Sequence, residues 1–400
     1  MKKLALFMIL ALILTLAGCA AQAPNVPPQV NAPPTNAPSA MPTEPIAQSV
    51  SGDDSAPAVI IATNGEHTLT GAINGQVLVT AANVTLILDN ATITCADASA
   101  ILGDDGNGQK KLQELTVKLV GISSVTSGAK HGIQGKDNLT ITGDGSLEVT
   151  AVKDGLHAGD TLNFESGTVN VLSSYEGVEA AYVNLIGGSL TTHASDDGVN
   201  AASDEEGVTP SVTISGGTHF IYSGSDGIDS NGTLTISGGS TAVLIYAPRD
   251  GQTFDADRPA TVLPTLNLQG KFAAGDVIAV FAADGKSLCE ITLDTAITAA
   301  AFTLPELVNG TAYSVTLNGA EFQSVTATTT VAAGMGAGFG GGQGGNRGDW
   351  SGEMPDWNGA VPPDGFAPPN GQNGGNFGGR GERGNAPIPP GNGTAPTIIT

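Results

Sequence analysis

Short runs of alternating apolar and polar residues fill the middle of the chain. Examples are Leu139-Thr140-Ile141, Leu162-Asn163-Phe164 and Val183-Asn184-Leu185, each followed within a few residues by glycine. Alternation with a period of two is typical of β-strands that bury one face, whereas the i, i+3, i+4 apolar spacing of a helix is missing from residue 58 onward. The pattern predicts an all-β domain in which Val, Ile and Leu point inward and Thr, Asn or Ser point outward.

A five-residue motif recurs between these runs: an acidic residue, glycine, an apolar residue, a polar or ionisable residue and a small residue. Its copies begin at Asp154, Glu176, Asp197 and Asp226, and a related copy without the acid begins at His131. The usual step is about 22 residues, and a period in the twenties marks stacked repeats that cannot bury their apolar faces alone. The sequence therefore predicts a solenoid in which equivalent residues of successive repeats lie about 4.8 Å apart.

The composition changes at both ends of this repeat region. We expect the stacked repeats to span residues 58–261. Residues 262–332 keep strand patterning but carry hairpin signals such as Asn309-Gly310, which predicts a small β extension that covers the open end of the solenoid. Residues 333–400 are rich in Gly, Asn and Pro and cannot bury a core, so we expect a disordered tail.

The N-terminus carries a secretion signal. Lys2 and Lys3 precede an apolar run that is too short to span a membrane, and the run ends in Leu16-Ala17-Gly18-Cys19. This ending resembles the bacterial lipobox, so residues 1–19 are expected to be a lipoprotein signal peptide and Cys19 the lipidated residue. Residues 20–57, rich in Pro and Ala, predict a disordered, extended tether. We expect a lipid-anchored protein at the bacterial cell surface, outside the cytoplasm.

The charge narrows the choice of partners. The net charge is −23, from 38 acidic and 15 basic residues, and no Lys or Arg occurs between Lys153 and Arg249. Nucleic-acid binding needs a basic surface, so that class is excluded. Aromatic residues make up only 4% of the chain, which favours thin repeats of small apolar residues over a conventional aromatic core. Cations are the natural partners of such a protein.

The acidic motif residues are candidate metal ligands. If they stack in one column, neighbouring carboxylates lie about 5 Å apart and repel each other by about 3 to 4 kcal/mol at an effective dielectric constant near 20. Oxygen-only donors suit Ca²⁺, and we expect glycine to turn the carboxylates outward. The alternative is that the Asp-Gly pairs only form turns. The predicted ligands are Asp154, Glu176, Glu179, Asp196, Asp197, Asn200, Asp226 and Asp229.

Several segments together resemble the secreted clostridial carbohydrate-binding β-helix family. They are Lys153 to Ala158, Ser195 to Ala201, the Ile-Ser-Gly-Gly strands, Leu304 to Tyr313 and the Gly-rich tail. The resemblance implies a right-handed parallel β-helix with bound Ca²⁺, similar in shape to pectate lyases, that binds acidic plant polysaccharide such as polygalacturonate. His131 departs from the acidic pattern, which puts metal binding by the first regular repeat in doubt.

Three classes of function remain open. We expect a cell-surface carbohydrate-binding lipoprotein that recognises acidic, pectin-like polysaccharide through Ca²⁺, and we assign no catalytic residue. A polysaccharide lyase or hydrolase on the same fold is the alternative enzyme, although Lys130, Lys136, Lys153 and Arg249 lie only at the margins of the acidic repeats. A surface adhesin with protein partners is the third class. The five histidines show no metal-binding spacing in the sequence.

Overall fold

The computed structural model describes residues 46–47, 50–51, 57–106, 113–247 and 251–330, all within one unit, Thr43–Thr400. These residues form strands and turns, which confirms the all-β prediction. No helix in these ranges is long and apolar enough to cross a membrane. The predicted signal peptide with Cys19, nearly all of the predicted tether and the Gly-rich tail lie outside the described residues, and the predicted domain limits stay predictions.

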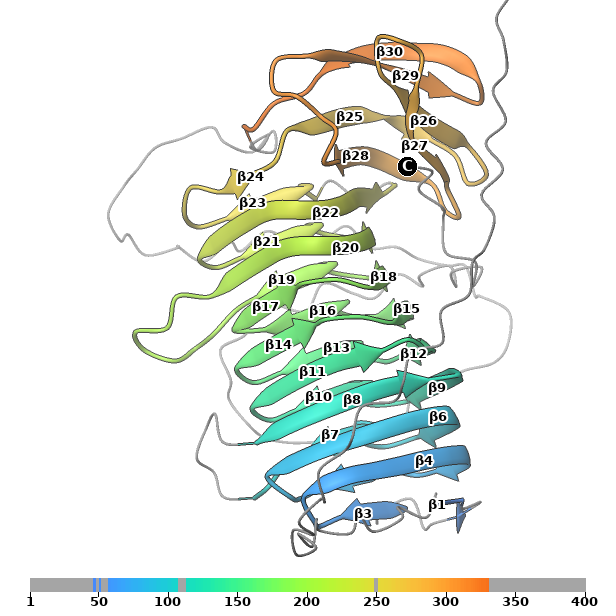
Figure 1. The fold of residues 1–400 in the computed structure, drawn as a ribbon, viewed down its shortest axis with the longest axis vertical. Helices are drawn as coiled ribbons and strands as arrows, with labels where there is room; N and C mark the ends of the chain where they lie inside the picture. The colour runs from blue at the N-terminus through green and yellow to red at the C-terminus, as the bar shows by residue number, and fades with distance from the viewer. Residues whose placement is uncertain (1–45, 48–49, 52–56, 107–112, 248–250, 331–400) are drawn as a thin grey trace, which may run out of the picture. The chain divides into compact units, whose positions relative to one another are not determined.

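A nine-stranded parallel sheet contains the acidic motifs. Its strands, in chain order, are β3 (Val59–Ile61), β5 (Val77–Val79), β7 (Ile101–Gly103), β10 (Ile133–Gly135), β13 (Leu156–Ala158), β16 (Val178–Ala180), β19 (Val199–Ala201), β21 (Ile228–Ser230) and β23 (Phe254–Ala256). Each strand pairs with the next of these along the chain, so equivalent motif residues lie side by side (Figure 1).

A seventeen-stranded sheet carries the alternating runs. Its strands are β1 (Ile46–Ala47), β2 (Val50–Ser51), β4 (Gly65–Asn74), β6 (Asn83–Cys95), β8 (Glu114–Val120), β9 (Ile122–Ser127), β11 (Asn138–Gly143), β12 (Ser146–Thr150), β14 (Thr161–Phe164), β15 (Thr168–Ser174), β17 (Tyr182–Leu185), β18 (Ser189–Ala194), β20 (Ser211–Ser223), β22 (Thr233–Tyr246), β24 (Thr261–Val262), β25 (Thr265–Phe272) and β28 (Ile297–Thr303). Leu139 pairs with Leu162, and Ile141 with Phe164, so buried residues of successive repeats form continuous apolar columns.

The prediction of an open, right-handed β-helix solenoid was wrong. Hydrogen bonding closes ten parallel strands of the larger sheet into a barrel. One half of the ring is β6, β8, β11, β14, β17 and β20, and the other half returns through β18, β15, β12 and β9 to β6. The ring closes because the long strands β6 and β20 each pair with one half through their first residues and with the other through their last.

The C-terminal residues add antiparallel strands to this framework. β28 pairs antiparallel with both β22 and β25, and a separate four-stranded sheet contains β26 (Val277–Phe281), β27 (Ser287–Thr292), β29 (Ala312–Leu317) and β30 (Ala320–Thr326). Two apolar clusters result. Val243 and Ile245 of β22 belong to the cluster of the repeats, whereas Leu244 and Tyr246 of the same strand belong to the C-terminal cluster.

The two cysteines in the described residues are free and buried. Cys95 lies in the cluster of the repeats and Cys289 in the C-terminal cluster. Each therefore packs as a small apolar side chain in a different part of the fold.

Candidate functional site

The first residues of successive acidic motifs form one column. The amide of Gly155 donates a hydrogen bond to the carbonyl of Glu176 at 2.9 Å, and the equivalent bonds from Gly177 to Asp197 and from Gly198 to Asp226 are both 3.0 Å long. These bonds place the first position of each motif beside that of the next, so the carboxylates come from the turns that lead into neighbouring strands of the nine-stranded sheet.

Three of the four carboxylates of this column are buried, which corrects the expectation that they face outward. Asp154, Glu176 and Asp197 are only 4%, 5% and 7% exposed. The motif glycine allows its backbone to pack closely against the neighbouring strands. A Cβ added at Gly155 would lie 2.6 Å from Cγ1 of Val171 and 2.8 Å from the carbonyl oxygen of Gly177. Gly155 has no left-handed φ, so close packing rather than a turn requires glycine there.

Three of the carboxylates bond to the backbone of the following repeat. The amide of Asp197 donates to Oε2 of Glu176 at 3.2 Å, and the amide of Asp226 donates to Oδ1 of Asp197 at 2.8 Å. The amide of Gln252 donates to Oδ1 of Asp226 at 2.6 Å. Each acid therefore stabilises the junction with the next repeat, through a contact between repeats and not through the local Asp-Gly turn of the alternative interpretation.

Burial and mutual repulsion make these groups reluctant to ionise. Burial, followed by the charges of Asp197 and Glu179, raises the pKa of Glu176 well above its ordinary value. Burial and then Asp154 raise the pKa of Glu179 to about 7. Burial likewise raises the pKa of Asp197 to about 8, helped by nearby aspartates and opposed by its bond from the Asp226 amide. These three groups therefore favour either a proton or a cation close by.

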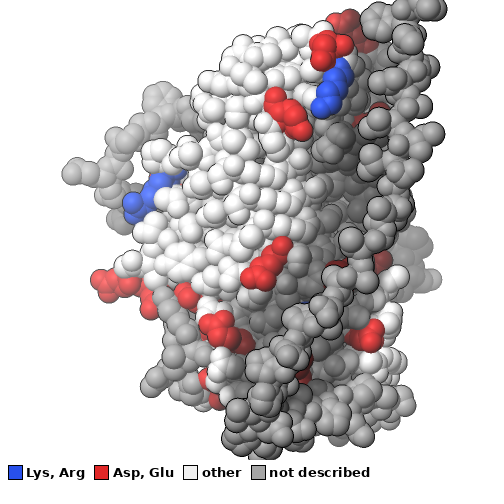
Figure 2. All heavy atoms as spheres, in the orientation of Figure 1, with Lys and Arg blue, Asp and Glu red and all other residues white. Residues whose placement is uncertain are grey.

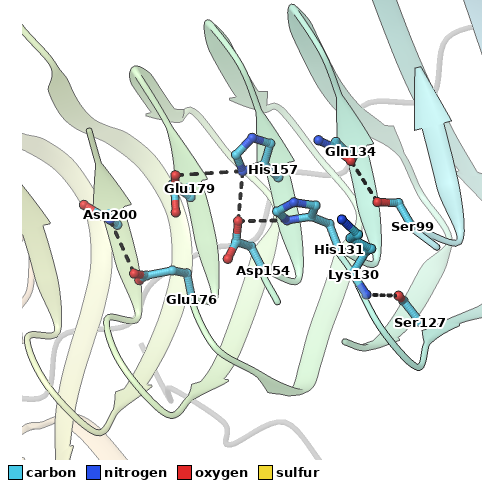
Figure 3. Close-up of polar contacts among 10 residues, drawn as sticks. All are labelled: Ser99, Ser127, Lys130, His131, Gln134, Asp154, His157, Glu176, Glu179 and Asn200. Atoms are coloured by element: carbon cyan, nitrogen blue, oxygen red, sulfur yellow. Dashed lines mark hydrogen bonds and ion pairs between the residues drawn. The ribbon is translucent and has the colours of Figure 1, made fainter. Parts of the chain in front are cut away.

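Asp154 differs because two imidazoles face it (Figure 3). Nδ1 of His157 forms a 2.8 Å hydrogen bond with Oδ2 of Asp154, and Nδ1 of His131 lies 2.9 Å from the same oxygen. Burial alone would raise the pKa of Asp154, but the two histidines lower it to about 2. The sequence interpretation missed this group because His131 and Asp154, at the first motif position of two repeats, meet His157, at the fourth, only through the pairing of β10 with β13.

The fourth motif position forms a second column beside the acids. Glu179, Asn200 and Asp229 pair in register on β16, β19 and β21. Nδ2 of Asn200 lies 3.5 Å from Oε1 of Glu176, whereas Oδ1 of Asn200 is buried without a hydrogen-bond partner. Among the described residues, only His131, Asp154 and His157 bring three His, Cys, Asp or Glu ligand atoms within 4.8 Å of one another. The predicted acidic ligands alone do not converge in this way.

An exposed strip runs beside the buried column. The amide of Lys153 bonds to the carbonyl of Lys130, that of Tyr175 to Lys153 and that of Asp196 to Tyr175, at 2.9–3.0 Å. Lys130 and Lys153 are exposed, and Tyr175 is 41% exposed. The strip therefore offers two cations and an aromatic ring.

On the face drawn in Figure 2, which is mostly uncharged, the acidic side chains are separated rather than gathered into one patch.

Comparison with known proteins gives the family. Residues 55–342 match the family described as carbohydrate-binding domain-containing protein. The chain belongs to this family. The carbohydrate-binding domain thus includes all of the acidic motifs and nearly all of the described strands, in agreement with the predicted carbohydrate-binding class. No curated protein matches significantly. A solved structure, the polysaccharide lyase-like protein from C. thermocellum as a gadolinium derivative, is 23% identical with a TM-score of 0.44, over 50% of this chain and 85% of that chain.

Proposed function

We propose that this carbohydrate-binding domain recognises acidic polysaccharide with the help of Ca²⁺ held beside the buried acidic column. The observation that carries the proposal is the burial of Glu176 and Asp197 next to one another in a protein of net charge −23. Buried carboxylates in contact need a counterion or a proton, and an acidic protein needs a cation to approach an acidic polymer.

The donor atoms suit a hard cation. Asp197, Asn200 and Asp229 would coordinate a metal ion only through oxygen atoms. Oδ1 of Asn200 is buried with no hydrogen-bond donor to satisfy it. Ca²⁺ accepts carboxylate and amide oxygens in flexible arrangements, so these residues with Glu176 are the proposed ligands. When bound, the ion would neutralise the column and offer positive charge to a uronate carboxylate. Asp154 is a poorer candidate because its Oδ2 already faces two imidazoles.

The exposed strip suits the sugar. Tyr175 presents an accessible ring that can pack against a sugar ring, while its hydroxyl provides a polar end. Lys130 and Lys153 follow in register and offer charge to the carboxylates of a uronate chain. A polymer lying along the strip would therefore meet the two lysines and then the Tyr175 ring, with the calcium-bearing column alongside.

Calorimetry with polygalacturonate tests this function. We expect native protein to bind in Ca²⁺, to lose binding in EDTA, and to lose at least about tenfold in affinity when Asp197→Asn removes a central ligand. The control is Glu165→Gln, an exposed acid outside the column. Binding that survives EDTA and Asp197→Asn alike would contradict the calcium part, and absence of binding to any uronate polymer would contradict the substrate class. Ultraviolet detection of unsaturated products in the same samples would reveal lyase activity instead of simple binding.

The proposal includes attachment to a membrane through Cys19, which rests on the lipobox-like sequence alone. We expect Cys19→Ala to move the protein from the membrane fraction to the soluble extracytoplasmic fraction. A matched substitution, Ala20→Ser, should leave it with the membrane. Equal fractionation of Cys19→Ala and native protein would contradict lipid anchoring without bearing on polysaccharide binding.

A further inference from the structure

Two histidines and an aspartate from adjacent repeats form a compact group separate from the proposed calcium ligands. His131 precedes β10, and Asp154 and His157 lie at β13, so the β10–β13 pairing brings them together. Their imidazole centroids are 4.4 Å apart with an interplanar angle of 34°. Figure 3 shows both rings directed toward the Asp154 carboxylate.

One member of the group is buried without a satisfying partner. His131 is 9% exposed, and its Nδ1 lies 2.9 Å from Oδ2 of Asp154, yet this nitrogen makes no hydrogen bond. Oδ2 already interacts with Nδ1 of His157 at 2.8 Å. A neutral imidazole nitrogen is a donor that transition metals commonly use in proteins. An imidazole nitrogen and a carboxylate oxygen this close, in a geometry that does not form a good hydrogen bond, are both positioned as donors to one metal ion.

We propose that His131, Asp154 and His157 bind a Zn²⁺ ion. Two imidazole nitrogens and one carboxylate oxygen are the donors that borderline transition metals prefer, and they differ from the oxygen-only set proposed for Ca²⁺. The ligand atoms all lie within 4.8 Å of one another. A tetrahedral ion with metal–ligand bonds of about 2.0–2.2 Å needs ligand atoms about 3.3 Å apart. Zn²⁺ therefore requires each imidazole nitrogen to withdraw from Oδ2 of Asp154, now at 2.8 and 2.9 Å, and the two nitrogens to settle at a similar separation from each other.

The site leaves room for a fourth ligand. The side chain of His157 is 20% exposed, and Oε1 of Glu179 lies 3.9 Å from its Nδ1. A water molecule or this carboxylate would complete a tetrahedral Zn²⁺ centre, and three protein ligands with one open position is the arrangement of catalytic zinc sites. Lys130 and Lys153 of the proposed sugar-binding strip directly precede His131 and Asp154 in the chain, so the group lies next to that strip.

Zinc titration of the full chain tests the site. The protein is treated with a chelator, dialysed into excess Ca²⁺ to saturate oxygen sites, and titrated calorimetrically with ZnCl₂. We expect one Zn²⁺ per chain and at least a tenfold loss of affinity in His157→Gln, with no loss in the control His67→Gln, whose ring bonds only to Thr63. His157 is partly exposed, so its variant should fold even if the more buried His131→Gln does not.

Cobalt substitution gives a second readout. Co²⁺ at a site with nitrogen ligands absorbs visible light, and this band should appear in native protein and disappear in His157→Gln and Asp154→Asn. Absence of saturable Zn²⁺ binding, or binding and absorption that are unchanged in His157→Gln, would overturn the zinc proposal. Neither result affects calcium-dependent polysaccharide binding, which is measured with Asp197→Asn.

Discussion

Equivalent residues of one repeat motif have opposite ionisation behaviour because their neighbours differ. Asp154 and Asp197 occupy the same motif position and are similarly buried. Two imidazoles lower the pKa of Asp154 to about 2 against the effect of burial, whereas burial and other aspartates raise the pKa of Asp197 to about 8. The column is therefore divided, with a histidine-rich end at His131 and an oxygen-rich end toward Asp229.

This division predicts an unusual dependence of stability on pH in EDTA. The pKa of Asp197 rises from 3.8 to about 8 on folding, so the folded state holds a proton that the unfolded chain releases between these values. The contribution of Asp197 is complete below pH 3.8 and is lost as the pH rises toward 8. Glu179, whose pKa rises from 4.5 to about 7, acts in the same direction.

Urea unfolding in EDTA between about pH 5 and pH 8 measures this loss. Native protein should become less stable as the pH rises, Asp197→Asn should flatten the curve, and Glu165→Gln should not. Ca²⁺ should restore stability at the upper end. A curve that is flat in native protein, or unchanged by Asp197→Asn, would show that this carboxyl is ionised in the folded state.

Close packing at the motif glycines predicts a steric effect. The Cβ of Gly155→Ala would meet Val171 and the carbonyl of Gly177, and overpacking of this kind costs about 1–3 kcal/mol of unfolding free energy. Denaturant unfolding checks the loss. The double variant Gly155→Ala, Val171→Ala should show a favourable coupling energy relative to the two single variants, because the smaller side chain removes one of the two clashes; strict additivity would contradict this explanation.

At the scale of elements, alternation and repeat period predicted the strands well. Leu139, Leu162 and Val183 are buried and in register because each strand repeats the same apolar spacing. The barrel could not be predicted, since its closure depends on how β6 and β20 divide their pairing between two neighbouring strands. The chain has a positive φ at Asn90 in β6 and at Gly217 in β20, and neither residue marks ring closure in the sequence. Only the long-range hydrogen-bond register distinguishes these strands.

The continuous apolar run at the end of β22 has a similar explanation. Ala242 to Tyr246 are all buried because one side of this strand contacts the repeats and the other contacts the C-terminal strands. Burial on both faces replaces alternation with an unbroken apolar run. The C-terminal strands therefore cover one face of β22, in addition to continuing the sheet beside it.

A buried polar group stabilises the contact between the repeats and the C-terminal strands, and this gives a further prediction. Nε2 of His193 lies 3.1 Å from Oδ2 of Asp294, and its Nδ1 bonds to Tyr246 at 2.9 Å. Removing one member of a buried polar pair leaves the other unsatisfied, so Asp294→Ala should lower the unfolding free energy by about 1–3 kcal/mol. Glu290→Ala, at an exposed acid in the same segment, is the control. Equal unfolding midpoints for the two variants would show that the pair contributes little.

At the scale of the whole molecule, sequence alone indicated what class of partner to expect but not how the site is built. Charge and repetition pointed to cations, and the repeat placed Asp154, Glu176 and Asp197 in one column. Their burial could not be anticipated because it depends on contacts such as that between Gly155 and Val171. The His131–Asp154–His157 group was missed because ligands that meet across repeats have no characteristic local spacing.

The most direct test of the calcium site is its location in crystals grown with Ca²⁺. Anomalous diffraction identifies the ion without reference to polysaccharide. We expect a peak coordinated by oxygens of Asp197, Asn200 and Asp229, and no such peak in Asp197→Asn crystals. A column that contains no ion, with Oδ1 of Asn200 still unpartnered and calcium only on exposed acids such as Glu165, would contradict the claim that the buried acids hold the cation.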